Sequence, residues 1–451
     1  MENAEHQETI AAQATAPGRG GVAIIRLSGP AVPSIMQVLL GCSLLPRDAR
    51  YLPFRDSDGE VIDIGIAIFF PHPHSFTGED VLELHGHGGP VVVDLILQRV
   101  LQLGARLARS GEFSERAFLN GKMDLAQAEA VADLIDASSQ QAARSAIRSL
   151  QGEFSNDIHS LAERLIHLRM YLEAALDFAE EEIDFLGDEK IALGLKQILE
   201  HLSLVQHKAK QGSFLREGIT LVIAGQPNVG KSSLLNALSG HEIAIVTDIP
   251  GTTRDVLRNV ILIDGLPVHV MDTAGLRESA DVVEQEGIKR AYSEMEKADL
   301  ILYLLEANKN QADAITALPS KMASHPVLFI RNKIDLTHEL PSLTTVNGHD
   351  VISLSVKSGA GLSLLKDHIK KRIGFQSSAE GLYFARRRHL EALTKAESHI
   401  KNSFTQLMES HLGELAAEDL RLAHLALCEI TGEFSADDLL GRIFSSFCVG
   451  K

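Results

Sequence analysis

The chain has 451 residues but only three cysteines, Cys42, Cys428 and Cys448, and no Cys-x-x-Cys pair. So small and odd a set argues against a disulfide framework and against a structural zinc site, and it fits a reducing compartment. No apolar run approaches the roughly 18 residues that a membrane span needs. The N-terminal residues MENAEHQETI also lack the basic and apolar regions of a signal peptide. We therefore expect a cytoplasmic protein.

Basic residues are scarce relative to acidic ones: 43 Lys and Arg stand against 60 Asp and Glu, which gives a net charge of −17. Because affinity for phosphate comes mainly from clustered Lys and Arg, this balance argues against a wide surface that binds nucleic acid. Any RNA contact must be local or shared with a partner. The composition, 45% hydrophobic and 23% charged, is that of a folded protein. The length suggests about three domains.

Three kinds of segment follow one another along the chain. Short strands broken by Gly and Pro, such as GGVAIIRLSG and EDVLELHGHGGP, predict an N-terminal α+β module over residues 1–120. Helical periodicity predicts a helical domain in two parts, over residues 121–217 and 377–451. Between them, residues 218–376 alternate β-rich runs with helical stretches. We therefore predict a multidomain α/β plus α protein, with a Ras-like P-loop domain of mostly parallel sheet inserted into a discontinuous helical domain.

The strongest motif is GQPNVGKS at Gly225–Ser232, between an apolar strand and a helical pattern. It matches GxxxxGK[ST], in which backbone N–H groups cradle phosphates, Lys231 reaches the β- and γ-phosphates and the Ser232 hydroxyl binds Mg²⁺. The DTAG run that begins at Asp272 fits the DxxG element, in which Asp holds the Mg²⁺ shell and the Gly amide senses the γ-phosphate. Together the two motifs predict a nucleoside triphosphatase.

The base-reading element is NKID, with Asn332, Lys333 and Asp335 after the strand VLFI. A carboxylate that accepts two hydrogen bonds from guanine would leave adenine with unpaired partners, which rejects the wrong base strongly. The SVK triplet at 355–357 follows the next strand and fits the SAK element that surrounds guanine, with Val in place of Ala. We therefore predict GTP rather than ATP as the substrate.

The segment TDIPGTTRD, between the P-loop and DTAG, is typical of a switch loop. Thr252 and Thr253 are candidates for the threonine that closes over Mg²⁺, and we assign that role to Thr253. Arg254 follows directly and is a catalytic candidate together with Lys231. The residues that we expect to bind GTP are Asn228, Val229, Gly230, Lys231, Ser232, Ser233, Thr247, Asp248, Ile249, Pro250, Gly251, Thr252, Thr253, Asp272, Thr273, Ala274, Gly275, Asn332, Lys333, Asp335, Ser355, Val356 and Lys357.

One departure from the small regulatory GTPases concerns catalysis. Leu276 follows DTAG, where those proteins carry a Gln that orients the attacking water. We expect Glu284 to position the water or act as general base, although Glu278 and Glu286 share the same acidic pattern. The amide oxygen of Asn228 in the P-loop, with switch carbonyls, can hold a monovalent cation where an arginine finger would otherwise place positive charge.

Longer stretches resemble the MnmE (TrmE) family of tRNA-modification GTPases, namely ATAPGRGGVAIIRLSG, SFTGEDVLELHGHGGP, GEFSERAFLNGKMDLAQAEA and EITGEFSADDLLGRIFSSFCVGK. The resemblance covers the chain from end to end. GTP-binding motifs occur in many GTPases, whereas a terminus of Cys, a hydrophobic residue, Gly and Lys is a far more specific mark.

The resemblance implies that the N-terminal module binds a tetrahydrofolate derivative, in the 5,10-methylene or 5-formyl form, and that it forms a homodimer. The positions that match folate binding are Arg26, Glu83, Lys122 and Lys451. Arg and Lys suit the carboxylates of a folate, and Glu83 can pair with the N–H groups of the pterin. Without the resemblance, Arg26 and Glu83 would be interpreted as exposed charges at strand ends.

The resemblance also implies a role for K⁺ in hydrolysis. Asn228, the carbonyls of Thr247 and Ile249, and Thr252 would coordinate K⁺, and Glu284 would orient water through an intermediary. K⁺ would promote pairing of the two G domains across the dimer and so complete the catalytic site without a separate activating protein.

The implied reaction needs a partner of the MnmG (GidA) family that carries FAD, in a heterotetramer or a larger complex. Together they would install an aminomethyl or carboxymethylaminomethyl group at carbon 5 of the wobble uridine of certain tRNAs. The one-carbon unit would come from methylenetetrahydrofolate and the amine from glycine or ammonium. GTP hydrolysis would drive a conformational change.

Other residues have simpler interpretations. Cys448 matches a family cysteine with a suggested catalytic role, but it equally fits a small residue packed at a helix end. The pairs HPH at 72–74 and HGH at 85–87 lack the spacing of a zinc site. The run RRRH at 386–389 suits tRNA contact, but a solvated helix start is the simpler interpretation.

Two other classes of GTPase compete with this interpretation. A ribosome-assembly GTPase of the Era or Der type shares the G domain but appends a small basic RNA-binding domain or a second G domain. This chain has one P-loop and acidic helical flanks. A membrane-remodelling, dynamin-like GTPase would need a lipid-binding segment, and the sequence contains no basic amphipathic helix.

Overall fold

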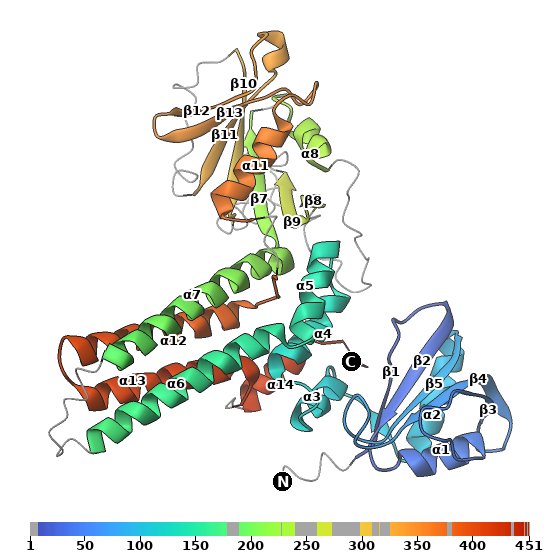
Figure 1. Ribbon diagram of the computed structural model, residues 1–451. Coiled ribbons are helices and arrows are strands. Elements are labelled where there is room, and N and C mark those ends of the chain that lie inside the picture. The colour runs from blue at the N-terminus through green and yellow to red at the C-terminus, as the bar shows by residue number, and fades with distance from the viewer. Residues whose placement is uncertain are drawn as a thin grey trace, which may run out of the picture. The chain divides into compact units, whose positions relative to one another are not determined.

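The computed structural model describes residues 8–177, 189–226, 228–239, 259–272, 298–308, 315, 325–376, 381–433, 437–445, 447, 448 and 450 (Figure 1). The chain divides into two compact units. The first comprises Met1–Ala132, Leu150–Ile198 and Lys395–Lys451, and the second comprises Asp133–Ser149 and Leu199–Thr394. The helices α7 (Glu189–Glu217) and α12 (Arg387–Met408) have residues in both units.

A six-stranded sheet forms the N-terminal part of the first unit, in the order β3-β4-β5-β2-β1-β6. Neighbouring strands are antiparallel, except that β1 and β6 are parallel. The strands are β1 (Ile10–Gln13), β2 (Gly20–Ser28), β3 (Arg50–Arg55), β4 (Val61–Phe70), β5 (Val81–Gly88) and β6 (Arg106–Leu107).

Helices α1 (Val32–Leu40) and α2 (Pro90–Gln102) pack on one face of this sheet (Figure 1). Ile25 and Leu27 of β2 share a buried cluster with residues of both helices. Because successive side chains of a strand point to opposite faces, Arg26 lies on the other face, with Glu83 of β5 directly across from it.

A buried ion-pair network holds helix α3 (Glu112–Leu119) to the strands. Arg116 is 2% exposed and binds both Glu112 and Glu79. Arg106 also binds Glu112, at 2.6 Å. Burial alone would raise the pKa of the Glu112 carboxyl, but the hydrogen bonds from Arg106 and from the backbone of Arg109 outweigh it and lower that pKa to about 2. Glu112 is therefore a carboxylate at neutral pH, which matches its cationic partners.

The helical part of the first unit contains α4 (Leu125–Ile135, which continues into the second unit), α6 (Glu153–Asp177), α13 (Gly413–Thr431) and α14 (Asp437–Ser445). Helix α6 packs along α13. Leu125 and Ala128 of α4 share a cluster with Phe444 and Phe447 at the C-terminus. Gly432 ends α13 in a left-handed conformation with φ 87°, where a Cβ would lie 2.9 Å from the Phe118 ring. Glycine is therefore needed both for this backbone and for the contact.

The second unit is built on a seven-stranded sheet in the order β12-β13-β11-β10-β7-β9-β8. Its five central strands are parallel, and the edge strands β12 and β8 are antiparallel to their neighbours. The strands are β7 (Ile219–Gly225), β8 (Asn259–Ile263), β9 (Leu266–Asp272), β10 (Leu300–Glu306), β11 (Val327–Asn332), β12 (Ser342–Val346) and β13 (His349–Ser353). Residues 221–224 of β7 are all buried, as expected for a central parallel strand.

Helices α8 (Lys231–Ser239), α11 (Leu362–Ile373) and α5 (Gln140–Leu150) contribute to the buried cluster on one face of this sheet. Helix α5 precedes the sheet by about 70 residues in sequence, yet its Ala142 and Ala146 pack in this cluster. The Ser139 hydroxyl donates to the carbonyl of Gly265, in the turn between β8 and β9, at 3.2 Å. The segment 133–149 is therefore part of the G-domain unit.

The two ends of the inserted segment meet at Asp133. One carboxylate oxygen of Asp133 accepts hydrogen bonds from Arg216, at the end of α7, and from Arg386, just before α12, at 2.8 and 2.9 Å. His389 is 2% exposed, and its Nδ1 accepts a hydrogen bond from the Arg386 backbone. Arg386 and His389 of the RRRH run thus have structural roles, while Arg387 is exposed beside Glu391.

The structure confirms the predicted fold class: an α+β module, a discontinuous helical domain and an inserted, mostly parallel sheet. The proposed domain limits at residues 120, 217 and 376 stay predictions. Within the described residues, none of the helices combines the length and apolar character needed to cross a bilayer.

Candidate functional site

The P-loop lies between β7 and α8, where the sequence predicts it. Gly225 has φ 141°, and a Cβ there would lie 2.6 Å from the carbonyl oxygen of Leu304. Gly230 has φ 100°, and a Cβ there would lie 2.5 Å from Nδ2 of Asn332. The Lys231 ammonium donates to the carbonyls of Gly225 and Gln226, at 2.9 and 3.1 Å, so it lies inside the loop where phosphates would bind. Glycine is therefore required at positions 225 and 230, because a side chain there would clash with Leu304 or Asn332.

Asn332, at the end of β11, connects the P-loop to the base-reading loops. Its side chain is buried, and its Nδ2 donates to the carbonyl of Val229 at 2.9 Å. Its Oδ1 accepts a hydrogen bond from the backbone N–H of Val356 at 3.1 Å. One side chain therefore holds together the three segments that the sequence predicts to contact the nucleotide.

Lys333 adopts a left-handed conformation with φ 70° directly after β11. Its ammonium donates to the carbonyl of Asn228 at 3.0 Å and pairs with Glu306 at 2.6 Å. Glu306 lies outside the motifs that the sequence predicts to bind GTP. The available signal was its position at the end of the predicted strand LILYLLEA, because the carboxyl ends of parallel strands meet at one edge of a sheet.

Asp335 is the residue that we expect to read the base. Its Oδ1 accepts a hydrogen bond from the Ser355 hydroxyl at 2.6 Å. This bond, with smaller contributions from its own backbone and from Lys357 and Lys333, holds the pKa of Asp335 below its ordinary value. The carboxylate is therefore ionised at neutral pH and can only accept hydrogen bonds, as recognition of guanine N–H groups requires.

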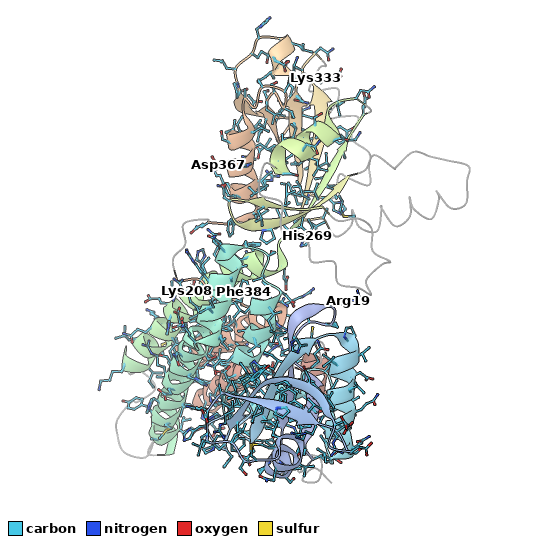
Figure 2. The ribbon with its side chains drawn as sticks, turned by 90° about the vertical axis from the view of Figure 1, so that its right-hand side faces the viewer. Arg19, Lys208, His269, Lys333, Asp367 and Phe384 are labelled. Carbon is cyan, nitrogen blue, oxygen red and sulfur yellow. The ribbon has the colours of Figure 1, made fainter. Side chains whose placement is uncertain are left out.

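These groups surround a cavity of about 670 Å³. A volume of roughly 300–1,000 Å³ is typical of small-molecule sites. The predicted residues that line it are Asn228, Gly230, Ser233, Asn332, Lys333, Asp335, Val356 and Lys357. Three residues that were not predicted also line it: Asn236, Ala237 and Leu336. Figure 2 shows Lys333 at one end of the second unit and His269 and Phe384 toward the other.

Several predicted residues fall elsewhere. Ser232 is exposed in the first turn of α8, and Asp272 ends β9 with only its backbone described. The predicted residues that lie outside the described part of the chain are Thr247, Asp248, Ile249, Pro250, Gly251, Thr252, Thr253, Arg254, Thr273, Ala274, Gly275, Leu276, Glu284 and Lys451. Their expected roles in magnesium, potassium, folate and water binding stay predictions.

A second cluster lies on the face of the N-terminal sheet opposite α1 and α2, where Phe113 of α3 also packs. Two nitrogens of Arg26, Nε and Nη2, each lie 2.9 Å from Oε1 of Glu83, and His85 approaches the other carboxylate oxygen at 3.2 Å. The Arg26 guanidinium lies 5.3 Å from the centre of the Phe76 ring and 5.8 Å from that of Phe113. The side chains of Arg26 and Glu83 are 22% and 16% exposed, so they are not the exposed strand-end charges of the simpler interpretation.

Lys122 and the C-terminus approach the same module. The Lys122 ammonium donates to the carbonyl of Pro73 at 3.0 Å, in the segment that also carries Phe76. The carbonyl of Cys448 accepts a hydrogen bond from the backbone of Gly111 at 3.3 Å, and a Cβ on Gly450 would lie 2.2 Å from the carbonyl oxygen of Gln13. Three of the four folate candidates are described, and Lys451 follows Gly450.

The remaining cysteine and histidine candidates have ordinary surroundings. All three cysteines are free, and Cys448 is exposed. His85 binds Glu83, and His87 Nδ1 lies 2.7 Å from Asp63. Among the described residues no group of three His, Cys, Asp or Glu side chains is arranged to hold a metal ion.

Comparison with known proteins extends over the whole chain. A family model described as the MnmE helical domain matches residues 125–448, and one described as the GTP-binding protein TrmE N-terminus matches residues 9–122. A curated tRNA modification GTPase MnmE from Yersinia pseudotuberculosis serotype IB is 59% identical over 450 residues, which is 98% of this chain and 99% of the relative. The chain belongs to the MnmE family of tRNA modification GTPases.

Other relatives agree with this assignment. The proteins named tRNA modification GTPase MnmE from Erwinia tasmaniensis and Pasteurella multocida are each 58% identical, over 99% of this chain and 100% of the relative. Solved structures that resemble it include an Aquifex aeolicus Era variant, 26% identical over 40% of this chain and 66% of that one, and the G domain of T. maritima FeoB, 25% identical over 34% and 98%. Both TM-scores are 0.26, too low to support an argument.

Membership of the MnmE family decides between the classes that the sequence left open. The chain is a GTPase of a tRNA-modification family. The Era or Der type and the dynamin-like type are therefore not its family. The cavity lined by the P-loop and by the NKID and SVK loops is the candidate GTP site.

Replacement of Asp335→Asn should change the base that this cavity accepts. An amide in place of the carboxylate can donate a hydrogen bond to the second carbonyl of xanthine, whereas it loses the paired acceptors for guanine. We expect KM for GTP to rise by about 100-fold or more and xanthosine triphosphate to become the better substrate. Steady-state hydrolysis of both nucleotides measures this change.

A Ser355→Ala variant is the matched control, because it keeps the carboxylate and removes the 2.6 Å hydrogen bond to it, together with the 3.3 Å bond that Ser355 accepts from the backbone of Ser358. It should weaken GTP binding modestly without acceptance of xanthosine triphosphate. Unchanged selectivity of the Asp335→Asn variant would show that NKID does not read the base.

Proposed function

We propose that this GTPase acts with an FAD-containing partner of the MnmG (GidA) family to modify carbon 5 of the wobble uridine of certain tRNAs. The product would carry an aminomethyl or carboxymethylaminomethyl group. The observation that carries the proposal is the near full-length identity to proteins named tRNA modification GTPase, combined with a GTP site and a second polar cluster on one chain. The GTP cycle would drive conformational change, while the carbon chemistry would occur elsewhere.

The P-loop supplies the electrostatic part of GTP hydrolysis. Lys231 is held inside the loop by two carbonyls, so its charge is positioned to stabilise the β- and γ-phosphates. The Ser232 hydroxyl in the first turn of α8 would bind Mg²⁺, which offsets phosphate charge. Glu284 and Arg254 would position water and stabilise charge, and Thr253 would complete the Mg²⁺ shell.

Asn228 supports a potassium role. It has φ 65°, an uncommon conformation for a residue other than glycine, and its carbonyl accepts a hydrogen bond from Lys333. Its side chain is exposed at the mouth of the nucleotide cavity, so the amide oxygen is accessible to a cation. Thr247, Ile249 and Thr252 would supply further oxygen ligands, and K⁺ would promote pairing of two G domains.

GTP turnover should therefore be at least about tenfold faster in KCl than in NaCl at equal ionic strength, because amide and carbonyl oxygens arranged for K⁺ fit the smaller Na⁺ poorly. An Asn228→Ala variant should lose most of this difference. Asn236→Ala, which alters another side chain of the same cavity, should keep it. Equal rates in the two salts for the unaltered chain would remove the cation role.

The cluster on the N-terminal sheet fits a folate. Arg26 and Lys122 are cations that suit the glutamate carboxylates of a folate, and Glu83 is an acceptor that suits pterin N–H groups. The Phe76 ring beside Arg26 offers an aromatic surface. Lys451 and the exposed Cys448 would complete the site from the C-terminus. When bound, the folate would supply a one-carbon unit.

An exposed apolar patch on this sheet supports the homodimer. Tyr51, Ile64 and Ile66 are 72%, 42% and 41% exposed, on the edge strand β3 and its neighbour β4. Tyr51 lies across from Ile66, and Ile66 lies across from His85, so the patch shares a face with the Arg26 and Glu83 cluster. A second copy of the chain packed on this face would cover the patch and adjoin the cluster.

A double variant Ile64→Asp, Ile66→Asp should be monomeric, because two charges on this patch would be buried without partners in the dimer. Sedimentation velocity of the unaltered chain should report a dimer. Val91→Asp, which places one negative charge on a valine of α2 that is 72% exposed, should leave the dimer intact. A dimeric double variant would place the contact elsewhere.

Mass spectrometry of wobble-position nucleosides tests the overall function in cells that lack this gene. Total tRNA should lose the carbon-5 aminomethyl-type modifications, and the unaltered gene should restore them. An Arg26→Gln gene should not, because it removes the cation expected to hold the folate. Intact modification without the gene would overturn the wobble proposal.

Arg50→Gln is the control for the folate position. Arg50 is also a strand arginine of this sheet, but its side chain is 54% exposed and pairs only with Asp48 among the described residues, at 3.5 Å. It should restore modification fully. Full restoration by Arg26→Gln as well, at equal protein level by immunoblot, would remove Arg26 from the folate site.

A further inference from the structure

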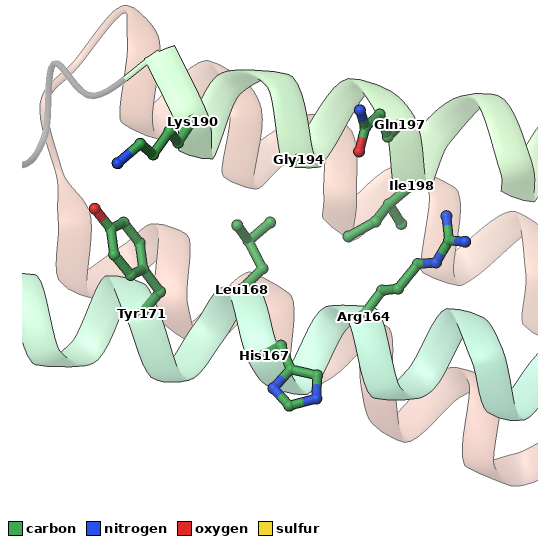
Figure 3. Close-up of a pocket in the computed structure, with 8 residues that line it drawn as sticks. All are labelled: Arg164, His167, Leu168, Tyr171, Lys190, Gly194, Gln197 and Ile198. Atoms are coloured by element: carbon green, nitrogen blue, oxygen red, sulfur yellow. The ribbon is translucent and has the colours of Figure 1, made fainter.

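A groove runs between α6 and α7 in the first unit, and it shares no lining residue with the nucleotide cavity. It encloses about 450 Å³ (Figure 3). On α6 its lining residues are Arg164, His167, Leu168 and Tyr171, at i, i+3, i+4 and i+7, which places them on one face of the helix. Neither the GTP site nor the folate cluster uses this groove.

The floor of the groove is apolar and its ends are polar. Figure 3 shows Leu168 and Ile198 directed toward each other between the helices. A Cβ on Gly194 would lie 3.1 Å from a methyl group of Leu168, so glycine permits the close approach of the two helices. The Lys190 ammonium and the Tyr171 hydroxyl lie at one end of the groove, and the Arg164 guanidinium lies at the other.

Among the residues that the structure describes, the lining contains hydrogen-bond donors and no carboxylate. Arg164 and Lys190 are cations, the Gln197 amide and the Tyr171 hydroxyl can donate, and His167 carries at least one ring N–H. Glu163 and Glu173 of the same helix do not line the groove. This composition contrasts with a chain that has 60 acidic and 43 basic residues. The groove therefore suits an anionic, acceptor-rich ligand.

We propose that this groove binds the sugar–phosphate backbone of tRNA. The proposal rests on the proposed function, which makes tRNA a ligand of this chain, and it identifies the local contact that the net charge of −17 requires. From Arg164 to Tyr171 the helix rises by roughly 10 Å, so the cations at the two ends of the groove can contact different phosphates of one strand. Arg164 and Lys190 bind phosphates, and Tyr171 offers a ring to a ribose or base.

Binding of a fluorescent, unmodified tRNA transcript to the full chain tests this proposal. The double variant Arg164→Glu, Lys190→Glu should bind the transcript about 10- to 100-fold more weakly than the unaltered chain. Its plot of log affinity against log salt should also be less steep by about 1.5, because two phosphate contacts are lost. Thermal unfolding by circular dichroism checks that the variant folds, and the milder Arg164→Gln, Lys190→Gln pair should weaken binding in the same direction.

The matched control is Lys196→Glu, Lys210→Glu, which makes the same change in charge on exposed positions of α7 that do not line the groove. It should bind tRNA as the unaltered chain does. Equal affinity of the groove variant and the unaltered chain would overturn the proposal and leave the groove to the acidic surface of a protein partner. Equal weakening by both double variants would also overturn it, since only overall charge would matter.

Absence of tRNA binding by the unaltered chain would overturn the groove proposal as well. The nucleoside analysis in the deleted strain is independent of this result, so it distinguishes a failed groove from a failed wobble function. Loss of modification in that strain together with unaffected binding by the groove variant would reject the groove alone.

Discussion

The candidate GTP site depends on two hydrogen bonds made by the buried side chain of Asn332. Its amide group bonds the P-loop on one side and the SVK loop on the other, at 2.9 and 3.1 Å. An unpaired buried amide would cost about 1–3 kcal/mol for each lost partner, so the two loops are held in one relative position. Lys333 follows Asn332 directly and Asp335 lies three residues after it, so the same contacts position both side chains. The segments that we expect to bind the base and the phosphates are therefore joined through one buried side chain.

In the N-terminal sheet, the alternation of side chains along each strand determines which residues lie on which face. One face is filled by α1 and α2, which bury every second side chain of β2 and β5. The other face carries the pair of Arg26 and Glu83 and, on β4 beside the strand of Glu83, the apolar patch with Ile66. Because one register fixes both sets, the polar cluster and the exposed apolar patch lie on the same face. A change in register by one residue would exchange the two faces and destroy both.

The sequence alone was sufficient for the fold class and for the order of the GTP-binding motifs, because the ends of parallel strands converge wherever such a sheet forms. It was insufficient for Glu306, whose pairing with Lys333 depends on β10 lying between β7 and β11. It was also insufficient for Asp133, whose partners Arg216 and Arg386 are 83 and 253 residues away. The folate candidates came from family resemblance, since composition cannot tell a paired, half-buried arginine from an exposed one.

Hydrogen bonds join the two ends of the inserted G domain to one another. Besides the two arginines on Asp133, Gln211 of α7 donates to the carbonyl of Gly374 at 2.7 Å and accepts from the backbone of Gln376 at 2.9 Å. A Cβ on Gly212 would lie 1.9 Å from the carbonyl oxygen of Tyr383, so only glycine allows α7 to approach that segment. The two ends of the inserted domain thus lie side by side, the arrangement in which an insertion least disturbs its host. Asp133 and Gln211 therefore bond the two connecting segments to one another.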